Sequence, residues 1–347
     1  MNIRELPTTG FEQLTSCTDE AGYHGLIAIH STQLGPAVGG TRFWQYQNEE
    51  EAINDVLRLA RAMTYKNALA GIPFGGGKSI ILKNERLTDR DAIFRAHGRF
   101  VETFGGSYIT AEDVGTNPRD MEFVRSETRH VAGLISGSGD PSPITARGVF
   151  RAMQAAAKYR WGSDNLERCT VALQGCGNVG YHLASYLHSA GAHLIVTDVD
   201  STKVERVVRE FGGLPVLPEQ IYKSDADILA PCALGGVIND ETVSQLKVEI
   251  VAGAANNQLL ETRHGDQLAA LDILYTPDFA ANAGGVINGC RELLGWEAEQ
   301  AAAKVDEIYD TVLKIFHLAA AEDIPSYKAA DSLAEQRLGH KIRVNDS

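Results

Sequence analysis

Thr170–Asp198, TVALQGCGNVGYHLASYLHSAGAHLIVTD, is the stretch that decides the fold. Its first residues predict a buried strand, the GxGxxG run at Gly175–Gly180 opens a helix, and a second apolar run predicts another strand. Asp198 ends that second strand about 23 residues after the first glycine, close to the spacing of a dinucleotide-binding unit. A lone GxGxxG is a weak signal, but in this context it indicates a Rossmann-type α/β domain.

Each part of the motif has a physical task in such a unit. Gly175 makes the tight turn, Gly177 lets the backbone approach a pyrophosphate, and Gly180 lets the helix pack on the strand. Backbone amides at the start of the helix, at Asn178 and Val179, carry the phosphate charge. The alternative is a glycine turn in an α/β domain without a cofactor.

Asp198 indicates which dinucleotide binds. Its carboxylate would accept hydrogen bonds from both hydroxyls of the adenosine ribose, and it would repel a 2′-phosphate. The sequence therefore predicts NAD rather than NADP as the cofactor.

Three further segments, Ala226–Gly236, Glu249–Gln258 and Ile273–Asn288, each predict a strand that ends in small and amide residues. In an open parallel sheet the carboxyl ends of the strands border the binding crevice. The candidate crevice residues are Pro231, Cys232, Ala233, Asn256, Asn257 and Asn282. An asparagine after a strand is also a common turn former or cap, so that interpretation stays open for each of them.

A second unusual stretch, Met63–Lys78 (MTYKNALAGIPFGGGK), lies in the N-terminal part. Gly77, Lys78 and Ser79 match the end of a phosphate-binding GxxxxGK[ST] loop, but that loop needs a glycine where Ile72 stands. The segment SIIL that follows predicts a strand, whereas a phosphate loop needs a helix N-terminus. The flanking ALAGIPFGGG is apolar, which argues against lysines on a solvated surface.

Lys66, Lys78 and Asp113 form a candidate reaction site. Two neighbouring lysines in an apolar cleft cannot both keep a normal pKa, because each charge opposes the other and burial lowers both. One can stay protonated on a substrate carboxylate while the other acts as a neutral general base, and Asp113 can pass protons to and from an amine. Beside a nicotinamide this division suits oxidation of an α-amino acid, in which an iminium forms and water attacks it.

Composition sets the class of protein. The 347 residues suffice for two domains, and 44% hydrophobic with 22% charged residues is typical of a soluble globular chain. A formal charge of −13 argues against nucleic acid or an anionic membrane surface as a partner and favours a small molecule. The start, MNIRELPTTG, lacks the apolar region of a secretory signal, and five scattered cysteines without C-x-x-C spacing predict reduced thiols and no metal site. We therefore expect a cytoplasmic protein.

Motifs along nearly the whole chain resemble the amino-acid dehydrogenases of the glutamate, leucine, phenylalanine and valine dehydrogenase superfamily, and the leucine enzymes most. They are LGPAVGGTR, DVLRLARAMTYKNALAGIPFGGGKS, TAEDVGTNPRDM, GDPSPITARGVF, LQGCGNVGYHLA, DILAPCALGG, AGAANNQL and NAGGVIN. The resemblance implies an oxidoreductase of amino acid catabolism that carries out NAD-dependent, reversible oxidative deamination of an L-amino acid to the 2-oxo acid and ammonia. By position it also implies that Lys66 binds the substrate α-carboxylate and that Lys78 and Asp113 are catalytic.

The same resemblance implies further contacts. Gly39 and Gly40 match a glycine pair under the substrate, Thr145 a residue beside the nicotinamide carboxamide, and Asn256 one near both substrate and nicotinamide. The full set of expected cofactor residues is Thr145, Gly175, Gly177, Asn178, Val179, Gly180, Asp198, Cys232, Ala233, Asn256 and Asn282.

The side-chain pocket predicts the substrate class. Glutamate enzymes of the superfamily hold the γ-carboxylate with a lysine just before the glycine pair and a serine after NAGG, and here Val38 and Gly289 stand there. A carboxylate facing an apolar pocket would lose its hydration without a partner, so an apolar substrate of the leucine, valine or isoleucine type is expected. Leucine enzymes usually carry valine where Gly289 stands, so phenylalanine or another bulky aromatic side chain is the alternative. The expected substrate pocket contains Val38, Met63, Ala111, Val286 and Gly289.

The superfamily layout implies two α/β domains with a cleft between them. Residues 1–135 plus 325–347 would bind the substrate and mediate oligomerisation, and residues 136–324 would form the NAD-binding Rossmann domain of a homo-oligomer, a dimer or larger. A non-catalytic module that binds NAD or an amino acid is one alternative, and loss of Lys78 or Asp113 would be its mark. A hydroxy-acid dehydrogenase is another, and it would use a histidine with an arginine.

Overall fold

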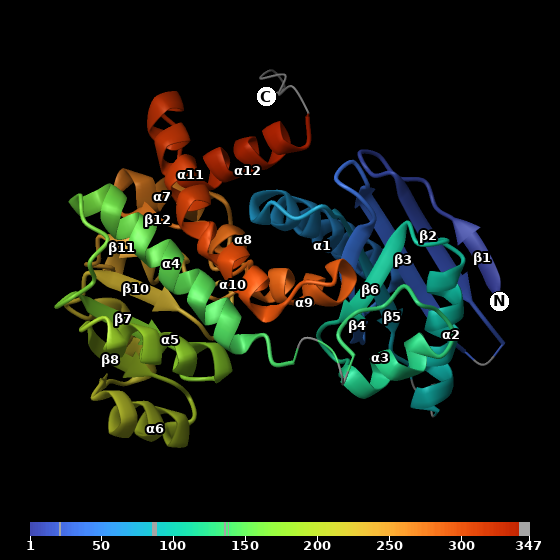
Figure 1. Cartoon of the computed structure of the whole chain (residues 1–347), viewed down its shortest axis with the longest axis horizontal. Helices are drawn as coiled ribbons and strands as arrows, with labels where there is room; N and C mark the ends of the chain where they lie inside the picture. Colours follow the sequence, from blue (N-terminus) through green and yellow to red (C-terminus); the bar gives the residue numbers. More distant parts are fainter. Residues whose placement is uncertain (21, 85–88, 135–136, 138, 340–347) are drawn as a thin grey trace. The chain divides into compact units, whose positions relative to one another are not determined.

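The computed structural model describes residues 1–20, 22–84, 89–134, 137 and 139–339. Contacts within the chain divide it into two compact units, called unit 1 and unit 2 (Figure 1). Of the described residues, unit 1 holds those of Met1–Gly139, Gly289–Trp296 and 337–339, and unit 2 holds those of Asp140–Asn288 and Glu297–Gln336. No helix among the described residues is long and apolar enough to cross a membrane.

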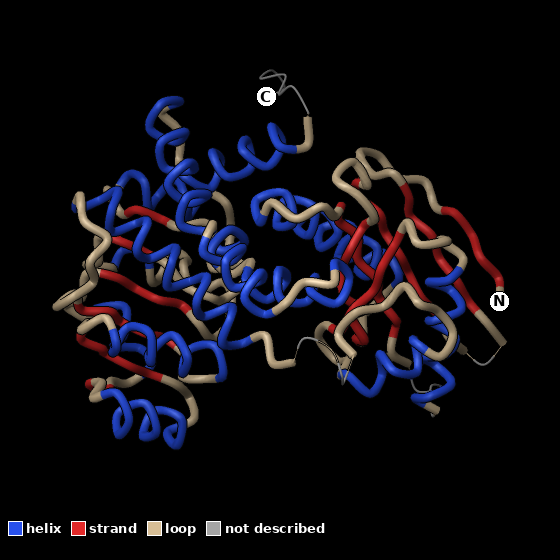
Figure 2. The backbone as a smooth tube through the Cα atoms, viewed as in Figure 1, coloured by secondary structure: helices blue, strands red, loops and turns tan. Residues whose placement is uncertain are grey.

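Unit 1 is built on a mixed six-stranded sheet with the order β1-β2-β3-β5-β4-β6. Its strands, red in Figure 2, are β1 (Asn2–Glu5), β2 (Gln13–Thr18), β3 (His24–Ser31), β4 (Ala37–Trp44), β5 (Gly75–Leu82) and β6 (Tyr108–Glu112). β1, β2, β3 and β5 pair antiparallel, whereas β4 runs parallel to both β5 and β6. The last three strands therefore end at the same edge of the sheet.

Helix α1 (Glu49–Ala70) covers one face of this sheet. Asn48 caps its start by accepting a hydrogen bond from Glu51 N at 2.9 Å, and Gly71 ends it in the left-handed conformation with φ 63°. Lys66 thus lies within the last turns of the helix. The apolar cluster between α1 and the strands contains Leu14, Leu26, Ala28, Ala52, Val56, Ala60 and Ile80.

Helices α2 (Arg90–Glu102) and α3 (Pro118–Arg125) cover the opposite face. Asn117 and Asp120 form a reciprocal capping box at the start of α3, with Pro118 at its first position. The cluster on this face includes Ile27, Phe43, Ile81, Phe94, Phe100, Met121 and Val124. The inner strands of the sheet are therefore buried on both sides by helices, whereas the edge strand β1 is exposed.

Unit 2 contains a parallel six-stranded sheet with the order β12-β11-β10-β7-β8-β9. Its strands are β7 (Thr170–Gln174), β8 (His193–Thr197), β9 (Leu214–Pro215), β10 (Ile228–Pro231), β11 (Ile250–Val251) and β12 (Leu274–Tyr275). Counted from β7, this is the 3-2-1-4-5-6 order of a doubly wound dinucleotide-binding sheet, whose strand order reverses between β7 and β10. The predicted α/β fold class with a Rossmann-type unit is confirmed.

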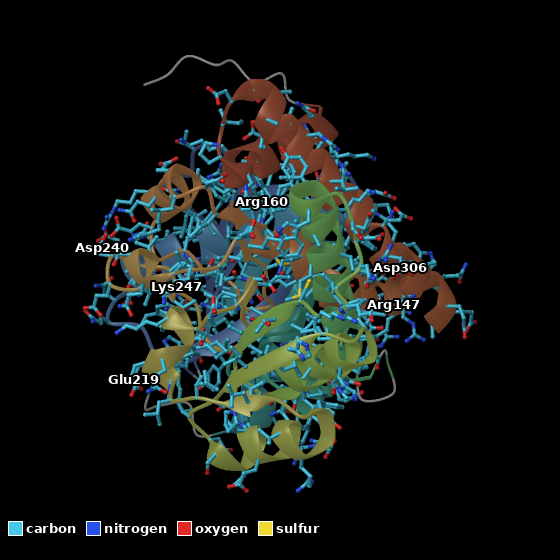
Figure 3. All side chains as sticks on the ribbon, turned by 90° about the vertical axis from the view of Figure 1, so that its left-hand side faces the viewer. Arg147, Arg160, Glu219, Asp240, Lys247 and Asp306 are labelled. Atoms are coloured by element: carbon cyan, nitrogen blue, oxygen red, sulfur yellow. The ribbon has the colours of Figure 1, made fainter. Side chains whose placement is uncertain are left out.

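The remaining helices lie wholly or partly in unit 2. They are α4 (Ser142–Trp161), α5 (Asn178–Ser189), α6 (Ser201–Phe211), α7 (Arg263–Ala270), α8 (Asp278–Ala281), α9 (Gly284–Leu294), α10 (Ala298–Asp306), α11 (Ile308–Glu322) and α12 (Ser326–Arg337), with 3-10 turns η1 (Pro218–Lys223) and η2 (Val243–Gln245). Arg147 of α4 and Asp306 of α10 lie side by side in Figure 3, joined by Nε–Oδ1 and Nη2–Oδ2 contacts of 2.8 and 2.6 Å. This bidentate pair ties α4 to α10.

The C-terminal boundary differs from the predicted one. The prediction gave residues 325–347 to the N-terminal domain, yet α12 as far as Gln336 belongs to unit 2. Contacts of α12 with unit 2 account for this, because Ser326 Oγ donates to Tyr275 O at 2.5 Å and Tyr327 packs against the apolar cluster that contains Tyr275.

A second segment departs from the predicted division in the opposite sense. Gly289–Trp296 joins unit 1, where Glu292 Oε2 accepts a hydrogen bond from Gly133 N at 3.0 Å. Helix α9 therefore contributes residues to both units. The predicted junction at residues 135–136 lies outside the described residues, as do residues 340–347.

Candidate active site

Lys78 and Asp113 form an ion pair in unit 1. Lys78 lies in β5 with its Nζ 2.9 Å from Asp113 Oδ2, and Asp113 directly follows β6. Lys78 is 5% exposed, and the side chain of Asp113 is 23% exposed. The two predicted catalytic residues are thus in contact, and one of them is almost wholly removed from solvent.

The three glycines before Lys78 belong to a strand and not to a turn. β5 begins at Gly75, ahead of the SIIL segment that predicts it. A Cβ at Gly76 would lie 2.0 Å from Thr64 N on α1, and one at Gly77 would lie 2.8 Å from the ring of Tyr108. Glycine at these positions lets α1 and its neighbours approach β5 closely.

Side-chain alternation places the charged groups on one face of the sheet. Along β5, Lys78 and Ile80 point to the face that α1 covers, since Ile80 packs against that helix. Arg42 of β4 points to the same face, because its Nη1 lies 2.8 Å from Asp55 Oδ2 on α1. Asp113 contacts both Lys78 and Arg42 there.

Other predicted substrate residues of unit 1 lie on elements of this face. Met63 and Lys66 are half-buried on α1, Val38 is buried in β4, and Ala111 is half-buried in β6. Alternation gives Val38 the same side of the sheet as Arg42, and Ala111 the same side as Asp113.

The glycine pair of β4 is required by the sheet itself. A Cβ at Gly39 would lie 1.7 Å from Gly77 O, and a Cβ at Gly40 would lie 2.4 Å from Glu112 O. Both positions therefore exclude any larger residue, whatever they contribute to substrate binding.

Arg42 is a candidate that the motifs did not single out. Its Nε lies 3.2 Å from Asp113 Oδ2. The signal in the sequence was its place in GGTR, where it shares strand parity with Gly40. That parity has meaning only once the segment is known to be a strand beside β5 and β6.

The ion pair shifts the pKa of both members. Burial lowers the pKa of Lys78, Asp113 opposes that change, and Arg42 adds to it, so the pKa is lowered. Burial raises the pKa of Asp113, but Lys78 and Arg42 outweigh burial and hold the pKa below its usual value. Asp113 is therefore a carboxylate, and Lys78 loses its proton more readily than an exposed lysine, which suits a general base.

A buried polar network ties β4, β5 and β6 together on the other face. His97 Nε2 lies 2.9 Å from Thr41 Oγ1 and 3.2 Å from Ser79 Oγ, and Thr41 Oγ1 lies 2.5 Å from Thr110 Oγ1. His97 Nδ1 lies 2.8 Å from the hydroxyl of Tyr23, and burial lowers the pKa of His97 to about 3. This neutral imidazole fixes the three strands that carry the charged groups.

In unit 2, the glycine turn has a geometry that fits a dinucleotide. Gly175 has φ 102°, and its Cβ would lie 2.7 Å from Ala233 N, while a Cβ at Gly180 would lie 1.9 Å from Gly175 O. A Cβ at Gly177 would meet no described atom within 4 Å. The fold thus requires the first and third glycines, whereas the second leaves open space before the N-terminus of α5 at Asn178, as a pyrophosphate needs.

Asp198 is held beside this turn. Its Oδ2 accepts a hydrogen bond from Cys176 N at 2.7 Å, and its Oδ1 accepts one from Asp200 N at 2.9 Å. These bonds fix the carboxylate at the ends of β7 and β8, which supports its predicted contact with a ribose.

Two of the asparagines that sequence left open as turn formers lie together. Asn282 Nδ2 lies 2.7 Å from Asn256 Oδ1. Thr145, in the first turn of α4, donates from Oγ1 to Pro141 O at 2.8 Å, and a Cβ at Gly285 would lie 2.9 Å from that Oγ1. The NAGG segment therefore approaches both Asn256 and Thr145.

Cys232 and Ala233 follow β10 and meet the glycine turn. Burial raises the pKa of the Cys232 thiol to about 12, so the thiol stays protonated. Cys232 N donates to Gln174 O at 2.7 Å, which holds this loop beside the end of β7.

The predicted residues fall into two groups. Unit 1 holds Val38, Gly39, Gly40, Met63, Lys66, Lys78, Ala111, Asp113 and Gly289. Unit 2 holds Thr145, Gly175, Gly177, Asn178, Val179, Gly180, Asp198, Cys232, Ala233, Asn256, Asn282 and Val286.

Comparison with protein families covers nearly the whole chain. Residues 12–130 match the family described as Glu/Leu/Phe/Val dehydrogenase, dimerisation domain. Residues 136–205 and 194–343 match Glutamate/Leucine/Phenylalanine/Valine dehydrogenase.

Individual relatives are similar over the same length. Leucine dehydrogenase of Bacillus subtilis (strain 168) is 53% identical over 332 residues, which cover 94% of this chain and 91% of the relative. Leucine dehydrogenase of Geobacillus stearothermophilus is 52% identical over 340 residues, 97% of this chain and 93% of the relative. The crystal structure of L-tryptophan dehydrogenase from Nostoc punctiforme superposes with a TM-score of 0.88 at 45% identity, covering 95% of this chain and 96% of that one.

Proposed function

Since the chain belongs to the glutamate, leucine, phenylalanine and valine dehydrogenase family and is therefore an amino-acid dehydrogenase with a nicotinamide cofactor, we propose that it oxidises a hydrophobic L-amino acid of the leucine, valine or isoleucine type with NAD. The products are the 2-oxo acid and ammonia, and the reaction is reversible. The observation that carries the proposal is the buried Lys78–Asp113 ion pair, with the apolar Val38 on the same face of the sheet.

The chemistry divides among three side chains of unit 1. The nicotinamide, when bound, accepts the hydride that leaves the substrate Cα. Lys66 holds the substrate α-carboxylate through its charge, and Asp113 takes a proton from the substrate ammonium group and returns one to the departing nitrogen. Lys78 in its neutral form takes a proton from the water that attacks the iminium carbon, and its lowered pKa favours that form.

NAD is the proposed dinucleotide. The Asp198 carboxylate, held by Cys176 N, would bind the ribose hydroxyls of NAD and repel the extra phosphate of NADP. We assign cofactor binding to unit 2 and substrate binding to unit 1.

Val38 and Gly289 carry the argument for an apolar substrate. Neither position offers a charge to a substrate carboxylate, so glutamate is disfavoured. A bulky aromatic amino acid is the second candidate. A Cβ at Gly289 would meet none of the described atoms within 4 Å, and the similar L-tryptophan dehydrogenase acts on such a substrate.

A module that binds without reacting is the remaining alternative. Its mark would be the loss of Lys78 or Asp113, and both are present and in contact. We further propose a cytoplasmic homo-oligomer, because residues 12–130 match a dimerisation domain, and light scattering on the purified protein tests the oligomer.

The decisive experiment is a substrate panel. NADH formation is measured with leucine, valine, isoleucine, phenylalanine, tryptophan and glutamate, and in parallel with NADP. We expect turnover of apolar amino acids with NAD and very little with glutamate. A folded protein that binds NAD and turns over none of them would refute the proposal.

The Lys78→Ala variant tests whether Lys78 of the ion pair acts as the general base. We expect loss of kcat by a factor of about 100 or more with unchanged NADH binding, because a general base contributes roughly that much. Full activity in this variant would remove Lys78 from the mechanism.

A further inference from the structure

A third charged side chain shares the Asp113 carboxylate. Arg42 Nε lies 3.2 Å from Asp113 Oδ2, the same oxygen that Lys78 Nζ contacts at 2.9 Å. The Arg42 side chain is 21% exposed, so solvent weakens this contact less than it would a surface pair. One carboxylate oxygen therefore serves two cations.

Arg42 is itself held from the other side. Its Nη1 lies 2.8 Å from Asp55 Oδ2 on α1, and that oxygen also accepts a hydrogen bond from the Tyr46 hydroxyl at 2.8 Å. Asp55 Oδ1 accepts a further bond from Arg58 Nη2 at 2.8 Å. The planar guanidinium is thus fixed at two of its nitrogens, which a lysine could not reproduce.

The proposed role of Lys78 as a base explains why Asp113 needs a second cation. Lys78 must lose its proton to act as a base, and the largely buried Asp113 would then lose one of its two cations. A buried carboxylate without a partner is costly and tends to take up a proton. Arg42 does not titrate in this range, so it remains a partner in both states of Lys78.

We propose that Arg42 is a positioning residue: anchored by Asp55, it holds the Asp113 carboxylate in place and ready to accept the substrate proton in both the charged and the neutral form of Lys78. The inference rests on the proposed function, since it assumes that Lys78 is the base.

Arg42 is a permanent cation in contact with the Lys78–Asp113 ion pair. The groups that act on Lys78 include Asp113, Arg42 and Asp55. Ionisable side chains on elements packed against β5 include Arg58, Arg61 and Lys66 on α1, Tyr108 and Glu112 on β6, and His30 on β3, with His97 on the opposite face. The pKa of His97 is lowered to about 3 by burial, and burial raises the pKa of Tyr108, so both are neutral. Removing the Arg42 charge takes away a repulsion on Lys78 and an attraction on Asp113, so the pKa of each should rise.

The test separates the charge of Arg42 from its geometry. kcat and KM are measured against pH for the wild type, Arg42→Gln, Arg42→Lys and Asp55→Asn, together with NADH binding and thermal unfolding. Arg99→Gln is the matched control, since Arg99 pairs with Glu127 at 3.5 Å on the exposed surface of α2 and should behave as wild type.

Arg42→Gln should lower kcat about tenfold or more and move the acidic limb of its pH profile upward by about one unit, with NADH binding unchanged. Arg42→Lys should keep the limb near its wild-type position but lose kcat, because one ammonium cannot bridge both carboxylates. Arg42→Gln combined with Asp55→Asn should lose no more than Arg42→Gln alone, because Asp55 acts through Arg42.

An unshifted limb with kcat within about twofold of wild type in Arg42→Gln would overturn the inference while leaving the proposed function intact. A wild type inactive on the whole panel would refute both. If Arg42→Gln does not fold, kcat of Arg42→Lys decides, since a purely structural arginine would leave kcat unchanged in any folded lysine variant, and an unchanged kcat would overturn the inference.

Discussion

Gly76 of β5 lies so close to Thr64 of α1 that a Cβ at position 76 would stand 2.0 Å from the Thr64 backbone nitrogen. Thr64 Oγ1 also lies 3.4 Å from Gly76 O. This approach sets the distance between the helix that carries Lys66 and the strand that carries Lys78. Its consequence for stability can be measured directly.

Gly76→Ala should destabilise unit 1. The added methyl meets the backbone of Thr64 as well as its hydroxyl, so a change of side-chain rotamer cannot relieve the clash and α1 must shift, and overpacking of this kind costs about 1–3 kcal/mol or more. Denaturant unfolding measures the loss. Gly289→Ala is the control, because its Cβ would meet no atom of the described chain within 4 Å. Equal stability of the two variants would contradict the close packing.

Gly177→Ala should leave folding intact and weaken the binding of the cofactor. Gly177 has φ −68° and ψ −164°, which alanine adopts readily, and its Cβ would point into open space. That space is where the pyrophosphate is expected, so the dissociation constant for NADH should rise about tenfold or more, or about 1.4 kcal/mol.

NADH fluorescence and thermal unfolding test the Gly177 variant together. Gly180→Ala is the contrasting variant, since its Cβ would lie 1.9 Å from Gly175 O and should cost stability as well. Unchanged NADH affinity in Gly177→Ala would place the phosphates elsewhere.

Local motifs predict the part of the candidate site that lies within one continuous segment of the chain. Gly175, Gly180 and Asp198 follow from the spacing of one strand–turn–helix–strand unit, and the structure gives each a contact that the motif implies. Asp113 was predictable as a residue that ends a strand. Its contact with Lys78 was not, because it depends on β4 lying between β5 and β6.

What the sequence missed depends on packing between distant segments. The proposed role of Arg42 depends on its contacts with Asp55 on α1 and Asp113 after β6, which no local sequence pattern predicts. The C-terminal segment divides differently from the prediction for the same reason, because contacts of α12 such as that of Ser326 Oγ with Tyr275 O join residues far apart in the chain.

His97 should make stability depend on acid pH. Burial lowers its pKa to about 3 in the folded state from an ordinary value of 6.5, so between these values the unfolded chain binds a proton that the folded chain does not. The contribution of His97 to the free energy of unfolding is therefore constant above about pH 6.5. As the pH falls through that window, the folded state becomes progressively less stable. The slope is at most about 1.4 kcal/mol per pH unit.

His97→Gln removes the group that binds this proton in the unfolded state. The variant loses hydrogen bonds to Thr41 and Tyr23 and should be less stable at neutral pH, yet its stability should fall less steeply on acidification. Urea unfolding at a series of pH values gives the slope for both proteins. Parallel curves would show that His97 is protonated in the folded state.

Gly289→Val tests how the size of the substrate pocket is set. Position 289 lies on α9 with room for a side chain, so valine should fold normally. If Gly289 lines the pocket, three added carbons narrow it, and kcat/KM for phenylalanine and tryptophan should fall about tenfold or more relative to leucine. A methyl group removed from or added to an apolar pocket changes selectivity by about that factor.

The graded control is Gly289→Ala, for which an intermediate change in the leucine-to-aromatic ratio is expected. Steady-state kinetics with leucine, phenylalanine and tryptophan give the ratios, and NADH binding should be constant across the three proteins. Loss of activity on all three substrates alike would mean that position 289 supports folding or catalysis and does not select the side chain. An unchanged ratio in Gly289→Val would show that position 289 does not line the pocket. In a close-packed pocket, a valine beside a bound indole or phenyl ring must change kcat/KM for the aromatic substrates.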